Sequence, residues 1–461
     1  MGWNANYAFL IATSTAITYL CGLGIEFLGR KEGKAAVIGR KCIVTAGFIS
    51  NLGILFFYKY FYFFLENINF VLEHFEIKPL TSSLEVLLPV GISFYTFQAL
   101  GYIVDVYRGE IEAEKNPLKY GLFVSFFPQL VAGPIERSGN LLEQIRDIPK
   151  KKTFEYHRIV NGFMLMLYGY FLKMVIADRV SIMVDYVFSQ YYNLGTFELI
   201  VAAIGFAIQI YCDFGSYSFI AIGAAQVMGF TLMENFNTPY FATSIKDFWR
   251  RWHISLSTWF RDYLYIPLGG NRCSKARKYL NLMITFLVSG LWHGAEWTYV
   301  IWGGIHGLYQ VIGDLLVPVK KKVNEVFEVK TDCTSYKLGQ MLITFSLTTF
   351  AWIFFRADSL SQAVLYIERI FSRFDPWVLF NGGLYTIGLE RYEANILIVA
   401  IAVLILADII RYRKGMRLDV FLQEQNFWFR WAVAIFMIVM VVVYGKYGPE
   451  YDANQFIYFQ F

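Results

Sequence analysis

One histidine stands inside a long apolar stretch of the chain. His293 lies in "FLVSGLWHGAEWTYVIWGG", between Trp292 and Gly294, and is one of five histidines in 461 residues. Titratable side chains in membrane-like sequence are costly and tend to face a protein interior or a water-filled cavity. Neutral imidazole can take a proton from a hydroxyl, which is the task of a general base in acyl transfer. His293 is therefore a candidate catalytic residue, and a cross-helix hydrogen bond is the structural alternative.

A second histidine lies in the most charged long segment, "TSIKDFWRRWHISLSTWFRDYLYIPLGGNR", residues 243–272. Its apolar residues recur at helical spacing, so we expect an amphipathic helix at the cytoplasmic surface of a membrane. His253 follows Trp249 by four residues and precedes Leu256 by three, at the edge of the apolar face. It would therefore point inward. The residues of that face are Ile245, Phe248, Trp249, Trp252, Leu256, Trp259, Phe260 and Tyr263.

An acidic residue and the remaining histidines are weaker candidates. Asp213, in "YCDFGSYSFIAIG", could orient a histidine, bind a polar substrate group or cap a half-helix, and a structural or supporting role is favoured. His306, in "WGGIHG", is expected to be a polar core residue, and His74 and His157 are expected at the surface. The chain has no GxSxG, Walker A, HExxH or DxD motif, which excludes the common hydrolases, NTPases and zinc proteases.

The elements that must position these residues are apolar helices. Hydrophobic residues make up 56% of the chain and charged residues 17%, against about 25% charged residues in soluble domains. The apolar blocks are near the ~20 residues that cross a bilayer, so the sequence predicts an all-α, multi-pass membrane protein. The blocks lie near residues 7–27, 35–65, 84–107, 121–131, 159–176, 196–230, 279–316, 338–355, 396–410 and 428–444.

Two of these blocks are too long for one perpendicular span. Residues 196–230 contain "YCDFGSYS" and residues 279–316 contain "WHGAEW", and we expect a broken or re-entrant helix at each. The block ending in "FFPQLVAGPIER" is also expected to be re-entrant, because Gly133-Pro134 cannot continue a helix. No internal repeat or low-complexity linker divides the sequence, so a single domain is predicted over residues 1–461.

Basic clusters recur between the apolar blocks, and by the positive-inside rule the loops that carry them lie in the cytoplasm. The clusters are short, scattered and always beside a span, which argues against a nucleic-acid partner. The cluster at residues 411–417 and the span at 428–444 would place the C-terminal tail, residues 448–461, outside the cytoplasm. The five cysteines are odd in number and widely spaced, so neither a disulfide nor a zinc site is predicted.

Five stretches, in order, resemble the membrane-bound O-acyltransferase family, and most closely its bacterial branch that acetylates polysaccharides such as alginate. They are "SFYTFQALGYIVDVYRG", "FFPQLVAGPIER", "CDFGSYSFIAIGAAQVMGF", "SIKDFWRRWHISLSTWFRDYLYIPLGGNR" and "LVSGLWHGAEWTYVIWGGIHG". The resemblance implies a ring of about ten to eleven tilted transmembrane helices, with re-entrant and amphipathic interfacial helices, around a central tunnel. It covers nearly the whole chain and places the core motifs in residues 244–311. Members of this branch usually carry one further apolar helix at the N-terminus, and this chain is expected to begin after it.

The same resemblance implies roles for single residues. The histidine of "WHG" is the catalytic one in this family and corresponds to His293. The histidine of "RRWHISLS" corresponds to His253, a second functional position that lines the tunnel. We also expect substrate to contact Trp292, Trp252 and Asp213.

The implied activity is transfer of an acyl group, expected to be acetyl, from a cytoplasmic thioester such as acetyl-CoA. The group would cross the cytoplasmic (inner) membrane for O-acetylation of an extracytoplasmic polysaccharide. The thioester would be a substrate and not a bound cofactor, and a secreted SGNH-type acetyltransferase is the expected outer partner. D-Alanyl transfer to teichoic acid is the alternative within the family. A transporter or flippase is the alternative from another class, and it predicts inverted repeats, which the sequence lacks.

The chain ends in "GPEYDANQFIYFQF", where Tyr458 stands three residues before the terminal Phe461. An aromatic belt at the membrane interface is one explanation. In related D-alanylation systems, however, a similar aromatic C-terminal motif on a small partner protein has been implicated in carrying the acyl group on its tyrosine. By that resemblance Tyr458 is a candidate acyl acceptor that His293 would activate, and such covalent catalysis splits one difficult transfer into two easier ones.

Overall fold

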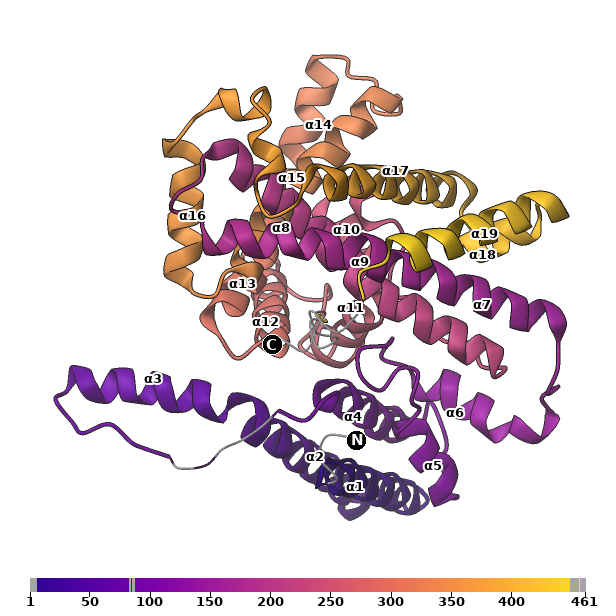
Figure 1. The fold of residues 1–461 in the computed structure, drawn as a ribbon. Helices are drawn as coiled ribbons and strands as arrows, with labels where there is room; N and C mark the ends of the chain where they lie inside the picture. Colours follow the sequence, from indigo (N-terminus) through magenta and orange to yellow (C-terminus); the bar gives the residue numbers. More distant parts are fainter. Residues whose placement is uncertain (1–5, 83, 85–87, 448–455, 457–461) are drawn as a thin grey trace. The chain divides into compact units, whose positions relative to one another are not determined.

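The computed structural model describes residues 6–82, 84, 88–447 and 456 (Figure 1). Within these residues the secondary structure consists of helices, with no strand. Seven of the described helices are long and apolar enough to cross a bilayer, or eight if the bent pair in residues 297–326 counts as one span. The prediction of an all-α, multi-pass protein is confirmed, whereas the count of ten to eleven spans is not.

Backbone packing divides the chain into two compact units. Unit 1 comprises residues 1–155, 228–233 and 294–296, and unit 2 comprises residues 156–227, 234–293 and 297–461. The candidate site residues that the structure describes, from Asp213 to His293, all lie in unit 2. The arrangement of these candidate residues is therefore set within unit 2.

Unit 1 is built on α1, α2 and α4, which lie side by side (Figure 1). Small residues let these helices approach closely. A Cβ atom at Gly47 of α2, for example, would lie 2.7 Å from Cδ1 of Ile103 on α4. The helices of this unit are α1 (Asn6–Gly29), α2 (Lys34–Leu55), η1 (Phe56–Tyr60), α3 (Phe61–His74), α4 (Ile92–Arg108), α5 (Pro117–Val124), α6 (Ser138–Arg146) and η2 (Ile148–Lys150).

Unit 2 contains the remaining helices, two of which matter most for the site region: α9 and the pair α12–α13. Its helices are α7 (Tyr156–Tyr170), η3 (Phe171–Ala177), α8 (Asp178–Ser189), α9 (Thr196–Val227), η4 (Pro239–Phe241), α10 (Ile245–Arg251), α11 (Ile254–Phe260), η5 (Arg261–Tyr265), α12 (Lys275–His293), α13 (Trp297–Leu315), α14 (Val317–Val326), α15 (Thr334–Arg356), α16 (Leu360–Ser372), η6 (Pro376–Leu379), η7 (Gly383–Tyr385), α17 (Arg391–Lys414), α18 (Leu418–Gln423) and α19 (Phe427–Tyr444).

The core of unit 2 is α9. Of the most apolar window of this helix, 72% is buried, against 44% or less for the other spanning candidates among the described helices. It packs along α7 (Figure 1), where a Cβ atom at Gly162 would lie only 2.7 Å from the backbone oxygen of Gly223. Such glycine pairs bring helix backbones together in membranes. A helix covered on so many sides can carry polar residues away from lipid.

The predicted break in residues 196–230 is wrong, because α9 runs without interruption through "YCDFGSYS". The polar groups of this stretch have partners in the folded protein. The Ser216 hydroxyl donates to the backbone oxygen of Asp213 at 2.5 Å, and the Asp213 carboxylate pairs with Nζ of Lys173 at 2.6 Å. A buried acid with a cationic partner and an internally bonded hydroxyl need no helix end to stabilise them.

The predicted break at "WHGAEW" is confirmed, because α12 ends at His293 and α13 begins at Trp297. The two helices pack against each other as an antiparallel hairpin. Near the turn, a Cβ atom at Gly303 would lie 2.2 Å from the backbone oxygen of Phe286, so any other residue there would push the two helices apart. At the far end, Lys278 and Asp314 form an ion pair at 2.7 Å. This close hairpin places His293 at the last position of α12.

Candidate active site

His253 lies at a sharp break in the backbone. The prediction of one amphipathic helix over residues 243–272 is wrong, because α10 ends at Arg251, Trp252 is extended, and α11 starts at Ile254. His253 itself has a φ of 43°, in the left-handed region that residues other than glycine seldom occupy. Strained backbone of this kind clusters at functional sites. The break turns the imidazole inward, as the sequence predicts.

Backbone pairing with another segment of unit 2 holds this break. The N–H of Asn237 donates to the oxygen of Arg251 at 2.9 Å, and the N–H of Ile254 donates to the oxygen of Asn235 at 2.9 Å. These two bonds lie on either side of His253, and they replace helical hydrogen bonds that a continuous helix would make. The partner segment lies in "ENFNTP", which carries no periodic pattern that would predict such a role.

Asn235 completes the support for His253, and sequence analysis missed it. Its side chain is 1% exposed, and Oδ1 accepts a hydrogen bond from the Ser255 hydroxyl at 2.6 Å. Its Nδ2 donates to Oγ of Ser218 on α9 at 3.1 Å. The amide thus ties α11 to α9 directly beside the break. A single buried asparagine in an otherwise irregular stretch gives no sequence signal that would identify it.

The His253 ring is fully buried at 0% exposure. It meets the ring of Phe214 on α9 edge to face, with centroids 4.6 Å apart, and lies 5.9 Å from the Trp292 ring. Burial lowers the pKa of His253 to about 3, because the charged imidazolium would lose its hydration. His253 lies outside the helices that could span the membrane, and at pH 7 its ring is neutral.

The His293 ring lies among aromatic side chains and is 4% exposed. Its centroid is 5.0 Å from Trp302 on α13 and 5.5 Å from Phe355 on α15. The rings of His293 and His253 lie 6.2 Å apart, although the residues are 40 positions apart in the sequence. The structure therefore brings the two predicted histidines together in one apolar environment. Such an environment excludes water from the two rings.

The two predicted substrate-binding tryptophans differ in their surroundings. Trp292 lies beside both histidines, 5.0 Å from the His293 ring and 5.9 Å from the His253 ring. Trp252 stacks on Phe248 at 5.5 Å and contacts Trp352 at 5.1 Å, so its indole belongs to the packing between α10 and α15. Trp292 is therefore the tryptophan that the structure places beside both histidines.

Asp213 pairs with Lys173, whose Nζ also lies 2.8 Å from Oδ1 of Asp178. Both carboxylates are buried, and the lysine lies on the π-helical turn η3. Because α9 is continuous, a role for Asp213 as the cap of a half-helix is wrong. Asp213 therefore takes part in a buried ion pair, and its contact with substrate stays a prediction; π-helical segments are frequent near functional sites.

The remaining predicted residues have simple outcomes. His306 is fully buried and its Nδ1 accepts a hydrogen bond from Nε1 of Trp249 at 3.2 Å, which confirms it as a polar core residue. His74 and His157 are exposed, as predicted. Tyr458 lies outside the described residues. Phe456, two positions before it, is described and 6% exposed.

The amino-acid sequence is similar to those of several known proteins. The chain is 37% identical over 415 residues to the probable alginate O-acetylase AlgI of Pseudomonas aeruginosa, which covers 90% of this chain and 74% of that protein. It is 35% identical over 387 residues to the peptidoglycan O-acetyltransferase of Helicobacter pylori, covering 78% and 69% of the two chains. The teichoic acid D-alanyltransferase of Bacillus subtilis is 30% identical over 237 residues, covering 48% of this chain and 57% of that protein.

The family assignment rests on the region that contains both histidines. The sequence profile of the membrane-bound O-acyltransferase family matches residues 114–356, more than half of the chain. This region includes the continuous α9, the break at His253 and the α12–α13 hairpin, whose first helix ends at His293. The chain therefore belongs to the membrane-bound O-acyltransferase family and is a multi-pass membrane O-acetyltransferase.

Proposed function

We propose that the protein takes an acetyl group from a cytoplasmic thioester, acetyl-CoA, and passes it across the cytoplasmic (inner) membrane for O-acetylation of an extracytoplasmic polysaccharide. The observation that carries this proposal is the pair of buried histidine rings, 6.2 Å apart, in a chain whose relatives acetylate alginate and peptidoglycan. The orientation of the chain in this proposal follows from its basic loops, which the positive-inside rule assigns to the cytoplasm. A cytoplasmic donor would then enter the site from that side of the membrane.

In the proposed reaction His293 is the general base. Its imidazole takes the proton of an attacking hydroxyl, the hydroxyl oxygen forms a bond to the thioester carbonyl carbon, and the carbon–sulfur bond breaks. The imidazolium then returns the proton to the leaving thiolate. His253, neutral because of its burial, would hold the donor by hydrogen bonding. Trp292, Trp252 and Asp213 would shape the path that the substrates take.

The proposed first acceptor is the phenol of Tyr458. Its acetyl ester would carry the group to the outer face, where a secreted SGNH-type acetyltransferase would transfer it to the polysaccharide. A covalent carrier divides one transfer across the membrane into two shorter steps. Tyr458→Phe retains the ring and removes only the nucleophile, so full polymer acetylation by this variant would contradict the step.

The experiment uses the full-length protein in proteoliposomes supplied with labelled acetyl-CoA. His293→Ala should abolish transfer of the labelled acetyl group to the protein, because the proposed base is removed. Membrane insertion should persist, because the substitution removes one ring from a unit that many helices stabilise. His157→Ala, at an exposed position, is the matched control and should behave as the wild type. For His253→Ala we expect a large but incomplete loss, because a positioning group is removed and the base remains. A His293→Ala rate close to that of the control would refute the mechanism.

D-Alanyl transfer is the second candidate function. The observation that favours it is the 30% identity to the teichoic acid D-alanyltransferase of Bacillus subtilis, although that match covers only 48% of this chain. The same proteoliposomes, given a D-alanyl thioester of a carrier protein in place of acetyl-CoA, separate the two functions. We expect transfer from acetyl-CoA and none from the D-alanyl donor.

A further inference from the structure

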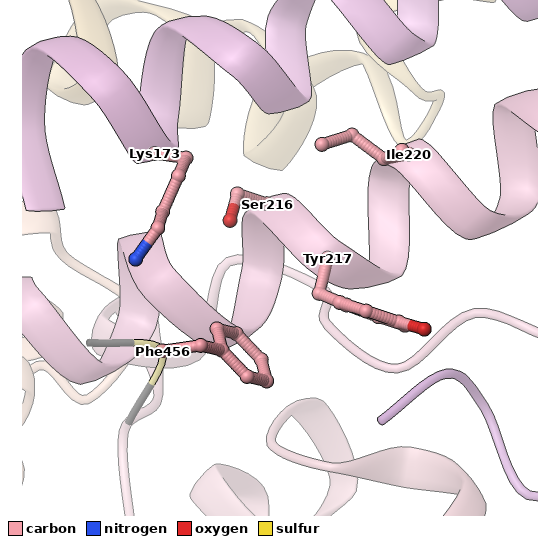
Figure 2. A pocket seen from close by; sticks show the side chains of 5 residues that line it. All are labelled: Lys173, Ser216, Tyr217, Ile220 and Phe456. Atoms are coloured by element: carbon pink, nitrogen blue, oxygen red, sulfur yellow. The ribbon is translucent and has the colours of Figure 1, made fainter. Parts of the chain in front are cut away.

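A cavity in unit 2 is lined in part by Phe456, a residue of the C-terminal tail. Five residues line this space of about 190 Å³: Lys173 of η3; Ser216, Tyr217 and Ile220 of α9; and Phe456. Figure 2 shows the Phe456 ring between the ammonium group of Lys173 and the ring of Tyr217. We call the first four residues the Phe456 socket.

Phe456 makes an aromatic contact and a cation–π contact with residues of the socket. Its ring centroid lies 5.3 Å from that of Tyr217, in a tilted arrangement typical of aromatic pairs. The Lys173 Nζ lies 5.6 Å from the same centroid, within the range of a cation–π interaction. Phe456 is 6% exposed, so nearly all of its apolar surface is covered. An aromatic ring that is covered and also faces a half-buried cation is held more firmly than a residue of a loose interfacial belt.

Lys446, ten residues before Phe456, contacts the same π-helical turn η3. The N–H of Lys446 donates to the backbone oxygen of Met174 at 2.9 Å, and its Nζ pairs with Glu393 at 2.8 Å. Arg179 bonds both the Glu393 carboxylate and the backbone oxygen of Tyr444. Lys446 and Phe456 therefore both attach to η3, ten residues apart in sequence. Two attachments to one turn are unlike the contacts of an unrestrained terminus.

The socket and the candidate active site both involve α9. Tyr217 follows Phe214 by three residues, which corresponds to a rise of about 4.5 Å and places both side chains on neighbouring faces of the helix. Phe214 contacts His253 at 4.6 Å, and the His253 ring lies 6.2 Å from His293. Tyr458 follows Phe456 by two positions in the sequence.

We propose that the Phe456 socket is an intramolecular binding site that positions the C-terminal tail for acyl transfer. Phe456 acts as a positioning residue that keeps the Tyr458 hydroxyl near the two histidines. The inference rests on the proposed function, in which Tyr458 accepts the acetyl group. It adds the site at which the chain holds its own acceptor. Holding an acceptor in place converts an encounter between two groups into a step within one complex.

The first experiment tests the socket without reference to catalysis. Tyr217→Cys and Phe456→Cys are combined in the full-length protein, and a short bifunctional thiol crosslinker is added. We expect a linked peptide containing both positions by mass spectrometry. Tyr217→Cys combined with Phe429→Cys, at an exposed position of α19, is the control. Crosslinking no greater than that of the control would overturn the socket.

The second experiment tests the positioning role. Phe456→Ala should lower kcat for acetyl transfer by about 100-fold, the usual effect of losing close alignment, while KM for acetyl-CoA stays unchanged. Phe456→Tyr retains a ring and should restore most of the rate, and Phe429→Ala should have no effect. A wild-type kcat in Phe456→Ala would overturn the positioning role.

The two proposals fail in different ways. If the wild type shows no acetyl mass on its C-terminal peptide and Tyr458→Phe acetylates polymer fully, the acyl-carrier step fails, even when the crosslink forms. If acetyl-Tyr458 forms but the crosslink does not, the carrier step stands and the socket is overturned.

Discussion

Gly303 is the position where adding one methyl group should damage the active site most directly. It lies on α13 beside Trp302, whose ring contacts His293. A Cβ atom there would lie 2.2 Å from the backbone oxygen of Phe286 and 3.1 Å from Cα of Gly290, both on α12, whereas ordinary contacts begin at 3.4 Å. Backbone atoms cannot rotate away as a side chain can. Gly303→Ala must therefore push α12 and α13 apart by about 1 Å.

The change in stability caused by Gly303→Ala is the sum of two opposing effects. Overpacking costs about 1–3 kcal/mol, and replacing glycine by alanine within a helix returns roughly 0.5–1 kcal/mol. The net loss of stability should leave a folded, inserted protein. A displacement of about 1 Å at catalytic groups, however, can lower the rate about 100-fold. We therefore expect a large fall in acetyl transfer with a small fall in Tm.

Gly304→Ala is the matched control, because it alters the next residue of the same helix. Its Cβ atom would meet only Cδ2 of Leu287, at 3.4 Å, so this variant should be as active as the wild type and as stable or slightly more so. Both variants are assayed in proteoliposomes with labelled acetyl-CoA, after size-exclusion chromatography shows comparable monodisperse protein. Rates within twofold of each other would refute the view that the close hairpin sets the position of His293.

Three further predictions concern residues that support the fold. Asn235→Ala leaves buried polar groups beside His253 without their amide partner, so it should lower the free energy of unfolding by about 1–3 kcal/mol and remove most of the activity. Asn237→Ala, at an exposed position, should change neither stability nor activity. Thermal unfolding measures the first quantity and acetyl transfer the second. Burial raises the pKa of Glu136 from 4.5 to about 7, so the native state binds the extra proton and stability should fall as pH rises from 4.5 through 7; Tm measured across this range should show a smaller slope in Glu136→Gln, and an unchanged slope would contradict the assignment. Lys173→Met, which leaves two buried carboxylates without their cation, should destabilise the protein by about 3–5 kcal/mol and far more than Asp213→Asn, which leaves one ion pair intact; equal Tm values for the two variants would count against the network.

The membrane class, the helix break before "GAEW" and the choice of His293 as a candidate follow from the sequence alone. Each depends on local composition: apolar blocks of spanning length, glycines that interrupt a helix, and a titratable ring in an apolar stretch. Local patterns also predict correctly that His253 points inward and that His306 is a core residue.

Tertiary contacts decide what local patterns cannot. Residues 196–227 form one uninterrupted helix, and Lys173 from another helix neutralises the Asp213 within it. Residues 243–272 form separate helices and not one, because Asn235 and Asn237 take the hydrogen bonds on either side of His253. Helical periodicity describes one segment at a time, whereas the partners that continue or interrupt a helix come from distant segments. For the same reason, only the fold brings His253 within 6.2 Å of His293 and places Phe456 against Tyr217.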